Sequence, residues 1–246
     1  MGTKVLKIGG SVLGTSKDLA KNLDIIGKNI GEYILKSDKC AIVVSALKGR
    51  TRQLDKNCEK LGISGEASAF AVSAGEIESA GLLSGYLNKI GMPAQALLPW
   101  NIVITKVVKG DFRNAEIEKI NIQPILECFH NSIIPVIPGY LGATVNGQPS
   151  TLAYDGSDIS AVAIAAAINA DNCVLFKDVP GIYGEDGIYE FDGKLYYSNL
   201  SYFRMKQISK NGGNVLHEKA VDMARKNNLP LWISKIGHSS KGTYIR

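Results

Sequence analysis

Several residue types and patterns are scarce in this chain of 246 residues, and each scarcity excludes a class of protein. The four cysteines show no CxxC or metal-ligand spacing, which argues against a zinc or redox motif and favours reduced thiols. The three histidines are far apart in sequence and form no ligand pattern. No serine, histidine and acid grouping stands out, so a hydrolase triad is not indicated either.

Long apolar runs and dense charge tracts are also missing. The longest apolar run, near residues 159–168, is alanine-rich and far too short to span a bilayer. Residues 1–10 are too short and too broken by glycine for a signal peptide. The basic residues are scattered, so we expect neither nucleic acid nor a membrane as a partner. We therefore expect a cytoplasmic protein, whose net charge of +5 suits an anionic substrate.

The opening stretch, Lys4 to Val12, organises the rest of the chain. Val5, Leu6 and Ile8 indicate a buried strand that ends in Gly9-Gly10-Ser11. Glycines there let an anion approach the main chain, and Lys7 can reach the same anion. The plain alternative is a strand, a flexible turn and a surface lysine, since the spacing is that of neither a P-loop nor a dinucleotide fingerprint. A phosphate site would require an acidic partner, an acceptor pocket and a nucleotide pocket downstream.

Strands and helices alternate along the chain, which predicts an α/β fold with a mostly parallel sheet and helices on both faces. Such sheets bind ligands beyond the carboxyl ends of their strands. The informative loops, GGS, SALKGRT and KDVPG, all follow expected strands. We expect helices at 18–36, from 51, 66–89, 114–131, 159–169, 202–210 and 217–226. We expect strands at 4–8, 40–46, 93–98, 102–108, 132–137, 173–176, 229–234 and, at an edge, 243–245. Asn146-Gly147 and Asp192-Gly193 indicate hairpins.

Asp158 is the candidate acidic partner, because it opens the alanine-rich helix after a loop at 150–158. Hydroxyl and amide donors at that position suit an anion, whereas an aspartate there is commonly just an N-cap. Phosphoryl transfer gives a reason for Asp158 to meet Lys7. In that chemistry the protein neutralises phosphates and aligns the acceptor, and a nearby aspartate positions lysines or acceptor, or helps to hold Mg²⁺.

Further candidates serve the acceptor and the nucleotide. Glu76, in a helix beside small residues, either pairs with a substrate ammonium or is an exposed helix glutamate. Hydroxyls of Ser45, Thr51 and Ser157 either hold a carboxylate or serve local turns. The loop from Lys177 to Tyr183 either lies on the nucleotide side, with Tyr183 at the ribose or base, or is a rigid Pro-Gly turn.

In this order, the motifs resemble the amino acid kinase family, and most of all the catalytic domain of its aspartokinase branch. KIGGS (7–11) resembles the family's KFGGTS, VVSA (43–46) with Gly49 and Thr51 resembles its second loop, and SAGE (73–76) resembles its SxGE. Further along the chain, TL and GSD (151–158) match part of its TLGRGGSD, DVPGIY (178–183) matches its segment of the same sequence, and VLH (215–217) matches the end of its FGAKVLHP. The likeness spans nearly the whole chain.

The resemblance implies a three-layer αβα sandwich of the carbamate kinase-like type, with a mostly parallel open sheet in one domain, 1–246. An acceptor lobe (about 1–145) would precede a nucleotide lobe (about 146–246), with the seam in the turn-rich segment 139–149. It implies a homodimer that transfers phosphate from MgATP to the side-chain carboxylate of L-aspartate, giving 4-phospho-L-aspartate for amino-acid (lysine) biosynthesis, without direct protein ligation of the Mg²⁺.

The resemblance also assigns roles by position. It implies a catalytic pair, Lys7 and Asp158. The phosphate and nucleotide residues would be Gly9, Gly10, Ser11, Lys177, Asp178, Gly181, Tyr183 and Asn214. The acceptor residues would be Ser45, Thr51, Glu76, Tyr154 and Ser157.

The chain departs from the family pattern in ways that leave other functions open. Tyr154 replaces an arginine expected to pair with a substrate carboxylate, and a phenol cannot replace that charged fork. Asn214 replaces a nucleotide-side lysine, while Lys177 replaces a threonine, so one cation has changed place. The chain also ends where regulatory ACT domains usually follow, so we expect no feedback through such domains. The alternatives are a kinase for another small acid or phosphate acceptor, a non-catalytic nucleotide- or ligand-binding homologue, and a subunit that needs a separate regulatory chain.

Overall fold

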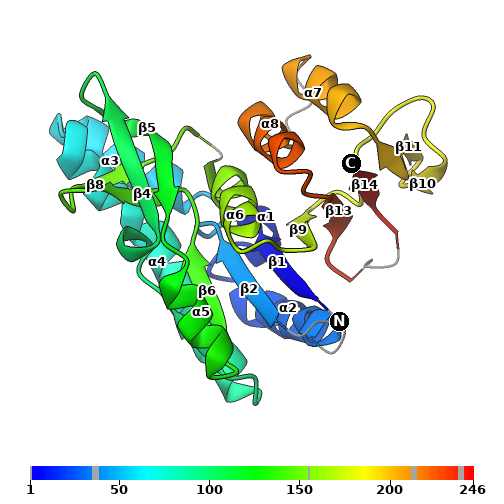
Figure 1. Ribbon diagram of the computed structural model, residues 1–246, viewed down its shortest axis with the longest axis horizontal. Helices are drawn as coiled ribbons and strands as arrows, with labels where there is room; N and C mark the ends of the chain where they lie inside the picture. The colour runs from blue at the N-terminus through cyan, green and yellow to red at the C-terminus, as the bar shows by residue number, and fades with distance from the viewer. Residues whose placement is uncertain (1, 35–38, 155, 212–214, 238–240) are drawn as a thin grey trace.

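The computed structural model describes residues 2–34, 39–154, 156–211, 215–237 and 241–246. Its centre is an eight-stranded sheet in the order β12-β14-β13-β9-β1-β2-β6-β3 (Figure 1). The strands are β1 (Thr3–Ile8), β2 (Lys39–Val44), β3 (Ala94–Ala96), β6 (Ile134–Pro138), β9 (Asn172–Lys177), β12 (Asn199–Leu200), β13 (Leu231–Lys235) and β14 (Thr243–Ile245). All neighbouring pairs are parallel except β13 with β14. The expected mostly parallel sheet is confirmed.

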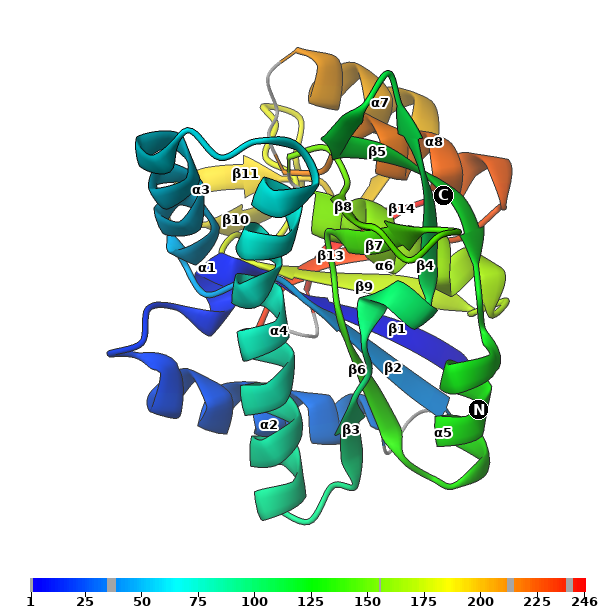
Figure 2. The same ribbon diagram turned by 90° about the vertical axis from the view of Figure 1, so that its left-hand side faces the viewer.

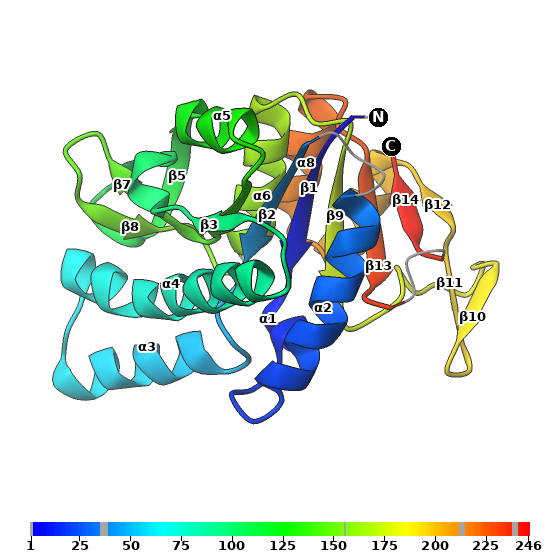
Figure 3. The ribbon, with the colours of Figure 1, turned by 90° about the horizontal axis from the view of Figure 1, so that it is seen from below.

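Helices cover both faces of this sheet, so the molecule has three layers (Figures 2 and 3). One face packs against α1 (Gly10–Leu13), α2 (Leu19–Ile34) and part of α4 (Gly65–Lys89). The other face packs against α6 (Gly156–Ala167) and α8 (Glu218–Lys226), with α5 (Gln123–His130) and α7 (Tyr202–Lys210) at its margins. The remaining helix, α3 (Arg50–Leu61), lies beside α4.

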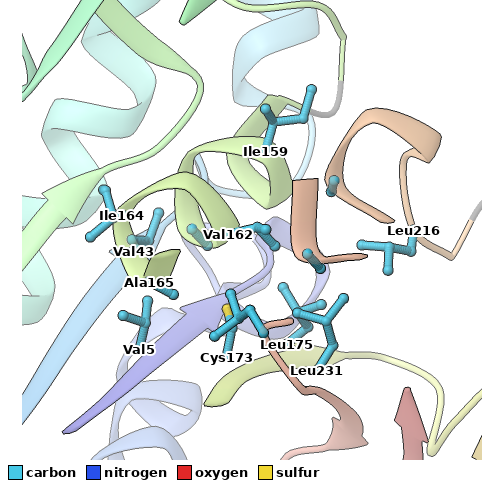
Figure 4. Packing of buried hydrophobic residues seen from close by; sticks show 14 of the residues in the cluster. Val5, Val43, Ile159, Val162, Ile164, Ala165, Cys173, Leu175, Leu216 and Leu231 are labelled. Atoms are coloured by element: carbon cyan, nitrogen blue, oxygen red, sulfur yellow. The ribbon is translucent and has the colours of Figure 1, made fainter. Parts of the chain in front are cut away.

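The side chains of the central strands alternate between the two layers, as the period of two in a strand requires. In β1, Val5 belongs to the apolar cluster under α6, whereas Leu6 and Ile8 belong to the cluster under α2. Figure 4 shows the α6 side of this core, where Val5 and Val43 pack below the helix. Because both faces are buried, the strands are continuous apolar runs, which is typical of parallel sheets.

A smaller four-stranded sheet, β5-β4-β7-β8, corrects one expectation from the sequence. Its strands are β4 (Val103–Val108), β5 (Asp111–Ile120), β7 (Leu141–Thr144) and β8 (Pro149–Thr151). The single helix expected at 114–131 is wrong, since only α5 in its second half is helical. Lys109 and Gly110 both have positive φ, 53° and 76°, which closes a tight hairpin and pairs β5 with β4. The charged residues of β5 favour a helix locally, and this pairing overrides that preference.

Other expectations differ in detail. Helix α6 begins at Gly156, so Ser157 and Asp158 lie in its first turn rather than in a preceding loop. β14 lies between β13 and β12, so the short β12, which the sequence did not indicate, forms the edge. The hairpins at Asn146-Gly147 and at Asp192-Gly193 are confirmed, the latter joining β10 (Tyr189–Phe191) to β11 (Lys194–Tyr196). The short 3-10 helix η1 (Pro99–Asn101) completes the described elements.

The seam expected at 139–149 falls on the β7–β8 hairpin, and the division into lobes there stays a prediction. All four cysteines are buried free thiols. Among the described residues, no helix combines the length and the apolar character that crossing a bilayer requires.

Candidate functional site

The alternation of the strands places three polar residues under the start of α6. Lys7 follows the parity of Val5 in β1, and Lys177 follows that of Leu175 in β9, so both point to the α6 face. Ser45, directly after β2, continues the parity of Val43. The strands are in register, with Lys7 opposite Val43 and Leu175, so these residues meet at one edge of the sheet.

Asp158 joins the two lysines that this edge supplies. Its Oδ1 lies 2.7 Å from the Nζ of Lys7, and its Oδ2 accepts a hydrogen bond of 2.6 Å from the Nζ of Lys177. The Asp158 side chain is only 2% exposed, and those of Lys7 and Lys177 are 6% and 16% exposed. The structure therefore brings together the acid and the lysine that are far apart in sequence, and it adds Lys177 to them.

The charge state of this cluster follows from its contacts. Burial alone would raise the pKa of Asp158, but the ammonium groups of Lys7 and Lys177 outweigh it and hold the pKa below its usual value. The carboxylate is therefore ionised at neutral pH. Among the described residues, this cluster contains two cations and one anion, and that excess of positive charge attracts an anionic ligand.

The glycine loop lies beside this cluster. A Cβ atom on Gly10 would lie 2.5 Å from the carbonyl oxygen of Ala46, so glycine is required for the loop to approach the end of β2. The amide of Gly9 donates to the carbonyl of Phe176 at 3.3 Å, which ties the loop to β9. The loop thus lies between the ends of β2 and β9, where Lys7 and Lys177 point.

Glu76 occupies the other end of the site. It projects from α4, is 2% exposed, and its Oε1 accepts a hydrogen bond of 3.3 Å from the hydroxyl of Thr51. Burial raises the pKa of Glu76 to about 7, against hydrogen bonds that lower it, including that of Thr51. Its Oε2 is buried and has no hydrogen-bond partner within the described part of the chain. A buried acid that lacks one partner suits a cationic ligand group.

A cavity of about 440 Å³ connects the two ends, a size typical of small-molecule sites. Ten of the residues singled out in the sequence line it: Lys7, Gly9, Gly10, Ser11, Ser45, Thr51, Glu76, Tyr154, Ser157 and Lys177. Asp158 lies behind the lysines. Tyr154 is 66% exposed at the cavity, so its ring is available to a ligand.

Three residues expected on the nucleotide side, Asp178, Gly181 and Tyr183, do not line this cavity. Asp178 is exposed, and Tyr183 packs edge-on against Tyr196. A Cβ on Gly181 would lie 2.5 Å from the Thr243 hydroxyl oxygen, so this glycine allows close packing between the loop and β14. These three positions keep their nucleotide role only as a prediction. Asn214 lies outside the described residues.

Three cavity residues were missed by sequence reasoning: Lys48, Arg52 and Tyr140. Tyr140 has a φ of 67°, a conformation that is strained for a bulky side chain and that often marks a functional site. Its place could have been inferred from Pro138-Gly139, which ends a third parallel strand. Lys48 and Arg52 flank Gly49 and Thr51, so their loop was recognised but their charges were not used.

Arg113, from β5, braces the acceptor end from outside the cavity. Its guanidinium donates to the Asp55 carboxylate at 2.7 Å and to the Tyr140 hydroxyl at 3.2 Å. It also donates to the Thr151 hydroxyl at 3.2 Å. The arginine therefore links α3 to the segment that leads into α6, and it holds the two sides of the cavity together.

Comparison with known proteins gives a consistent result. The profile of the amino acid kinase family matches residues 2–235. An aspartokinase of Helicobacter pylori strain J99 is 32% identical over 235 residues, which are 94% of this chain and 57% of that protein. A crystal structure of an aspartate kinase from Synechocystis superposes with a TM-score of 0.82 at 26% identity, covering 99% of this chain and 39% of that one.

The same fold extends to a UMP kinase from Bacillus anthracis, with a TM-score of 0.69 at 19% identity over 100% of this chain and 96% of that one. The chain spans 59% and 54% of the length of two of the curated relatives that it matches. With a family profile matched across almost its whole length and the expected sheet observed, this chain belongs to the amino acid kinase family.

Proposed function

We propose that this protein phosphorylates the side-chain carboxylate of L-aspartate with MgATP, giving 4-phospho-L-aspartate. The observation that carries the proposal is the ion cluster of Lys7, Asp158 and Lys177, which lies at one end of a cavity while buried Glu76 lies at the other. One end suits transferred phosphate and the other an amino group. Similarity to aspartokinases supports this choice of acceptor.

The chain's own residues account for most of the work in phosphoryl transfer, which is alignment and charge stabilisation. The ammonium groups of Lys7 and Lys177 stabilise charge on the transferred group, and Asp158 fixes both in place. The glycine loop, which is tied to β9 beside Lys7 and Lys177, would hold phosphate oxygens. Asp158 is bonded to two cations, so its role is to position the lysines rather than to accept a proton.

The acceptor would lie with its ammonium on Glu76 and its side-chain carboxylate toward Lys7. Hydroxyls of Ser45 and Ser157, which line the cavity between these points, are available to the acceptor. Binding an ammonium ion favours the ionised form of Glu76, so the ligand completes the electrostatics of that end.

Mg²⁺ fits as an ion that arrives with the nucleotide rather than as one held by a protein cage. The cavity carboxyl Glu76 lies at the acceptor end, and Asp158 is occupied by two lysines. Phosphate oxygens and water would therefore supply its ligands. The ion would add positive charge at the phosphates, and the chain's own task is to align them.

The test is formation of aspartyl hydroxamate from MgATP, L-aspartate and hydroxylamine by the purified protein. We expect aspartate-dependent hydroxamate that is lost in Lys7→Ala. Turnover with other small acids or with a nucleoside monophosphate, but not with aspartate, would instead support a kinase for another acceptor, which Tyr154 and the shared UMP kinase fold favour. If folded protein neither binds MgATP nor turns over any acceptor, that result would support a non-catalytic homologue.

Three further expectations accompany this function: a homodimer, a cytoplasmic location and a place in the biosynthesis of lysine and related amino acids. Sedimentation equilibrium of the purified chain tests the first, and a single species at the monomer mass would contradict it.

A further inference from the structure

Acceptor binding as proposed leaves one charge without a partner. L-Aspartate carries an ammonium, the side-chain carboxylate that accepts phosphate, and a second carboxylate on the same carbon as the ammonium. Glu76 suits the first and the lysine cluster the second. Tyr154, at the position of the family arginine, has no charge to offer the α-carboxylate. Another cation at the acceptor end is needed.

The cavity is lined by four cationic side chains within the described residues: Lys7, Lys48, Arg52 and Lys177. Lys7 and Lys177 are both within 2.7 Å of Asp158 and lie at the phosphate end. The α-carboxylate must lie beside the ammonium, because both groups are bonded to one carbon atom. Its partner must therefore lie next to Glu76.

Lys48 and Arg52 both line the cavity but have different neighbours. The Lys48 amide donates to the carbonyl of Gly14 at 2.9 Å, which places this residue beside α1 and the glycine loop. Arg52 directly follows Thr51, whose hydroxyl donates to Glu76 at 3.3 Å. Only Arg52 of these two is thus adjacent in the chain to the residue that contacts Glu76.

Arg52 is also uncommitted, unlike the neighbouring arginines. Arg50 donates to the Glu78 carboxylate at 3.1 Å, and Arg113 is bonded to Asp55. In the part of the chain that the structure describes, the Arg52 side chain forms neither a hydrogen bond nor an ion pair with another residue. Its guanidinium is therefore available for a bidentate contact with a carboxylate, which a lysine cannot make.

We propose that Arg52 binds the α-carboxylate of the acceptor and so determines specificity for an amino acid, taking over the contact that Tyr154 cannot make. This assignment rests on the proposed function. It places the ammonium on α4 through Glu76 and the α-carboxylate on α3 through Arg52, so that the two packed helices together select an α-amino acid.

The test combines a variant with an altered substrate. L-Aspartic acid α-amide keeps the ammonium and the side-chain carboxylate but removes the α-carboxylate. We expect Arg52→Gln to raise the KM for L-aspartate about 10- to 50-fold with kcat changed less than about threefold, as for loss of a charge-assisted contact. For the amide, KM should be high with wild-type protein and change less than about twofold in Arg52→Gln, because the missing contact cannot be lost twice.

Two matched controls separate this contact from general charge effects. Lys56→Gln removes one positive charge from an exposed position one turn farther along α3, and Arg50→Gln removes the guanidinium that is bonded to Glu78. Both should leave the KM for aspartate within about twofold. Arg52→Lys should recover part of the affinity, because it keeps the charge but not the fork.

The outcomes distinguish the two proposals. If wild-type protein makes aspartyl hydroxamate and Arg52→Gln leaves its KM unchanged, or weakens aspartate and the amide by equal factors, the assignment of Arg52 is overturned and the proposed function stands. If folded wild-type protein makes no hydroxamate from aspartate, the proposed function fails, and the assignment fails with it.

Discussion

The site has one buried carboxyl in the cavity wall, Glu76, and one behind the lysines, Asp158, and the two carboxyls behave oppositely. Asp158 and Glu76 are both 2% exposed. The pKa of Asp158 is held below its usual value despite burial, whereas burial raises that of Glu76 to about 7. The difference lies in their neighbours, because two ammonium groups contact Asp158 while Glu76 receives a hydroxyl and faces Asp55.

This contrast shows which half of the site is complete before a ligand binds. The phosphate end has both lysines held by Asp158 and is therefore preorganised, a state that favours stabilisation of developing charge. Within the described part of the chain, the acceptor end has a carboxyl with one unpartnered oxygen, on Glu76, and an arginine side chain without an ion pair, that of Arg52. Its electrostatics are completed by the substrate, so selectivity is expected there and catalytic power at the other end.

Breaking the phosphate end should have the largest effect. Asp158→Asn leaves two buried ammonium groups without their anion, so we expect kcat to fall by about 10³-fold or more, with a lower melting temperature. The double variant Asp158→Asn/Lys177→Met removes one of those ammonium groups. It should recover much of the melting temperature without the activity. Recovery of activity in it would contradict the positioning role of Asp158.

Removing Lys177 alone should have the next largest effect. Lys177→Ala takes away one of the two cations at the phosphates, and we expect kcat to fall about 10²-fold. Lys28→Ala, an exposed lysine on α2, is the matched control and should leave the rate unchanged. Equal rates for the two variants would show that Lys177 is a structural partner of Asp158 only.

The role of Glu76 at the acceptor end should appear in the pH dependence of kcat/KM for aspartate. Ionised Glu76 binds an ammonium and protonated Glu76 does not, so kcat/KM for aspartate should rise with pH and level off above about 7. Below that value it should fall about tenfold per unit. In Glu76→Gln, kcat/KM should be lower and this dependence absent, while Glu78→Gln, at an exposed position two residues on, should keep it. A profile in Glu76→Gln with the wild-type shape would assign the dependence to another group.

The smallest effect is expected from Lys48, and it tests which cavity residues serve the phosphate end and which serve the acceptor end. Lys48 lies beside the glycine loop, so Lys48→Gln should raise the KM for ATP about two- to fivefold and leave that for aspartate unchanged. Arg52→Gln should do the reverse. Measuring the KM for ATP and the KM for aspartate in both variants tests this assignment directly. A raised KM for aspartate in Lys48→Gln would show that Lys48 belongs to the acceptor end.

The sequence carried enough information to predict the phosphate end. Strand patterns, glycines and ordered motifs predicted that Lys7 and the residues after β2 and β9 gather at one edge of the sheet, and Asp158 was a candidate partner. These signals are local, because each depends on a few adjacent residues and on the period of a strand. The contact between Lys177 and Asp158 was not predicted, since it requires the register of β9 against β1.

The acceptor end depends on long-range pairing and was predicted less well. The charged residues of β5 favour a helix locally, and the segment is a strand only because it pairs with β4. The Arg113 brace could not be inferred without that strand. Tyr140 was missed because its backbone strain appears only in three dimensions. A role for Arg52 could not be predicted from the sequence, because an arginine in a helix is ordinarily a solvated side chain.

The alternation of side chains along β1 limits where insertions and deletions can be tolerated in this chain. One residue inserted before Lys7, with the strand pairing kept, would turn its side chain toward α2 and send an apolar neighbour toward Asp158. A two-residue insertion would restore the parity but move Lys7 about 6.6 Å along the strand, away from Asp158, so no length change between the start of β1 and Gly9 preserves the site. The hairpin tip at Val145, which is 74% exposed, carries no such constraint. Length variation among descendants of this chain should therefore accumulate at that tip and be absent between the start of β1 and Gly9.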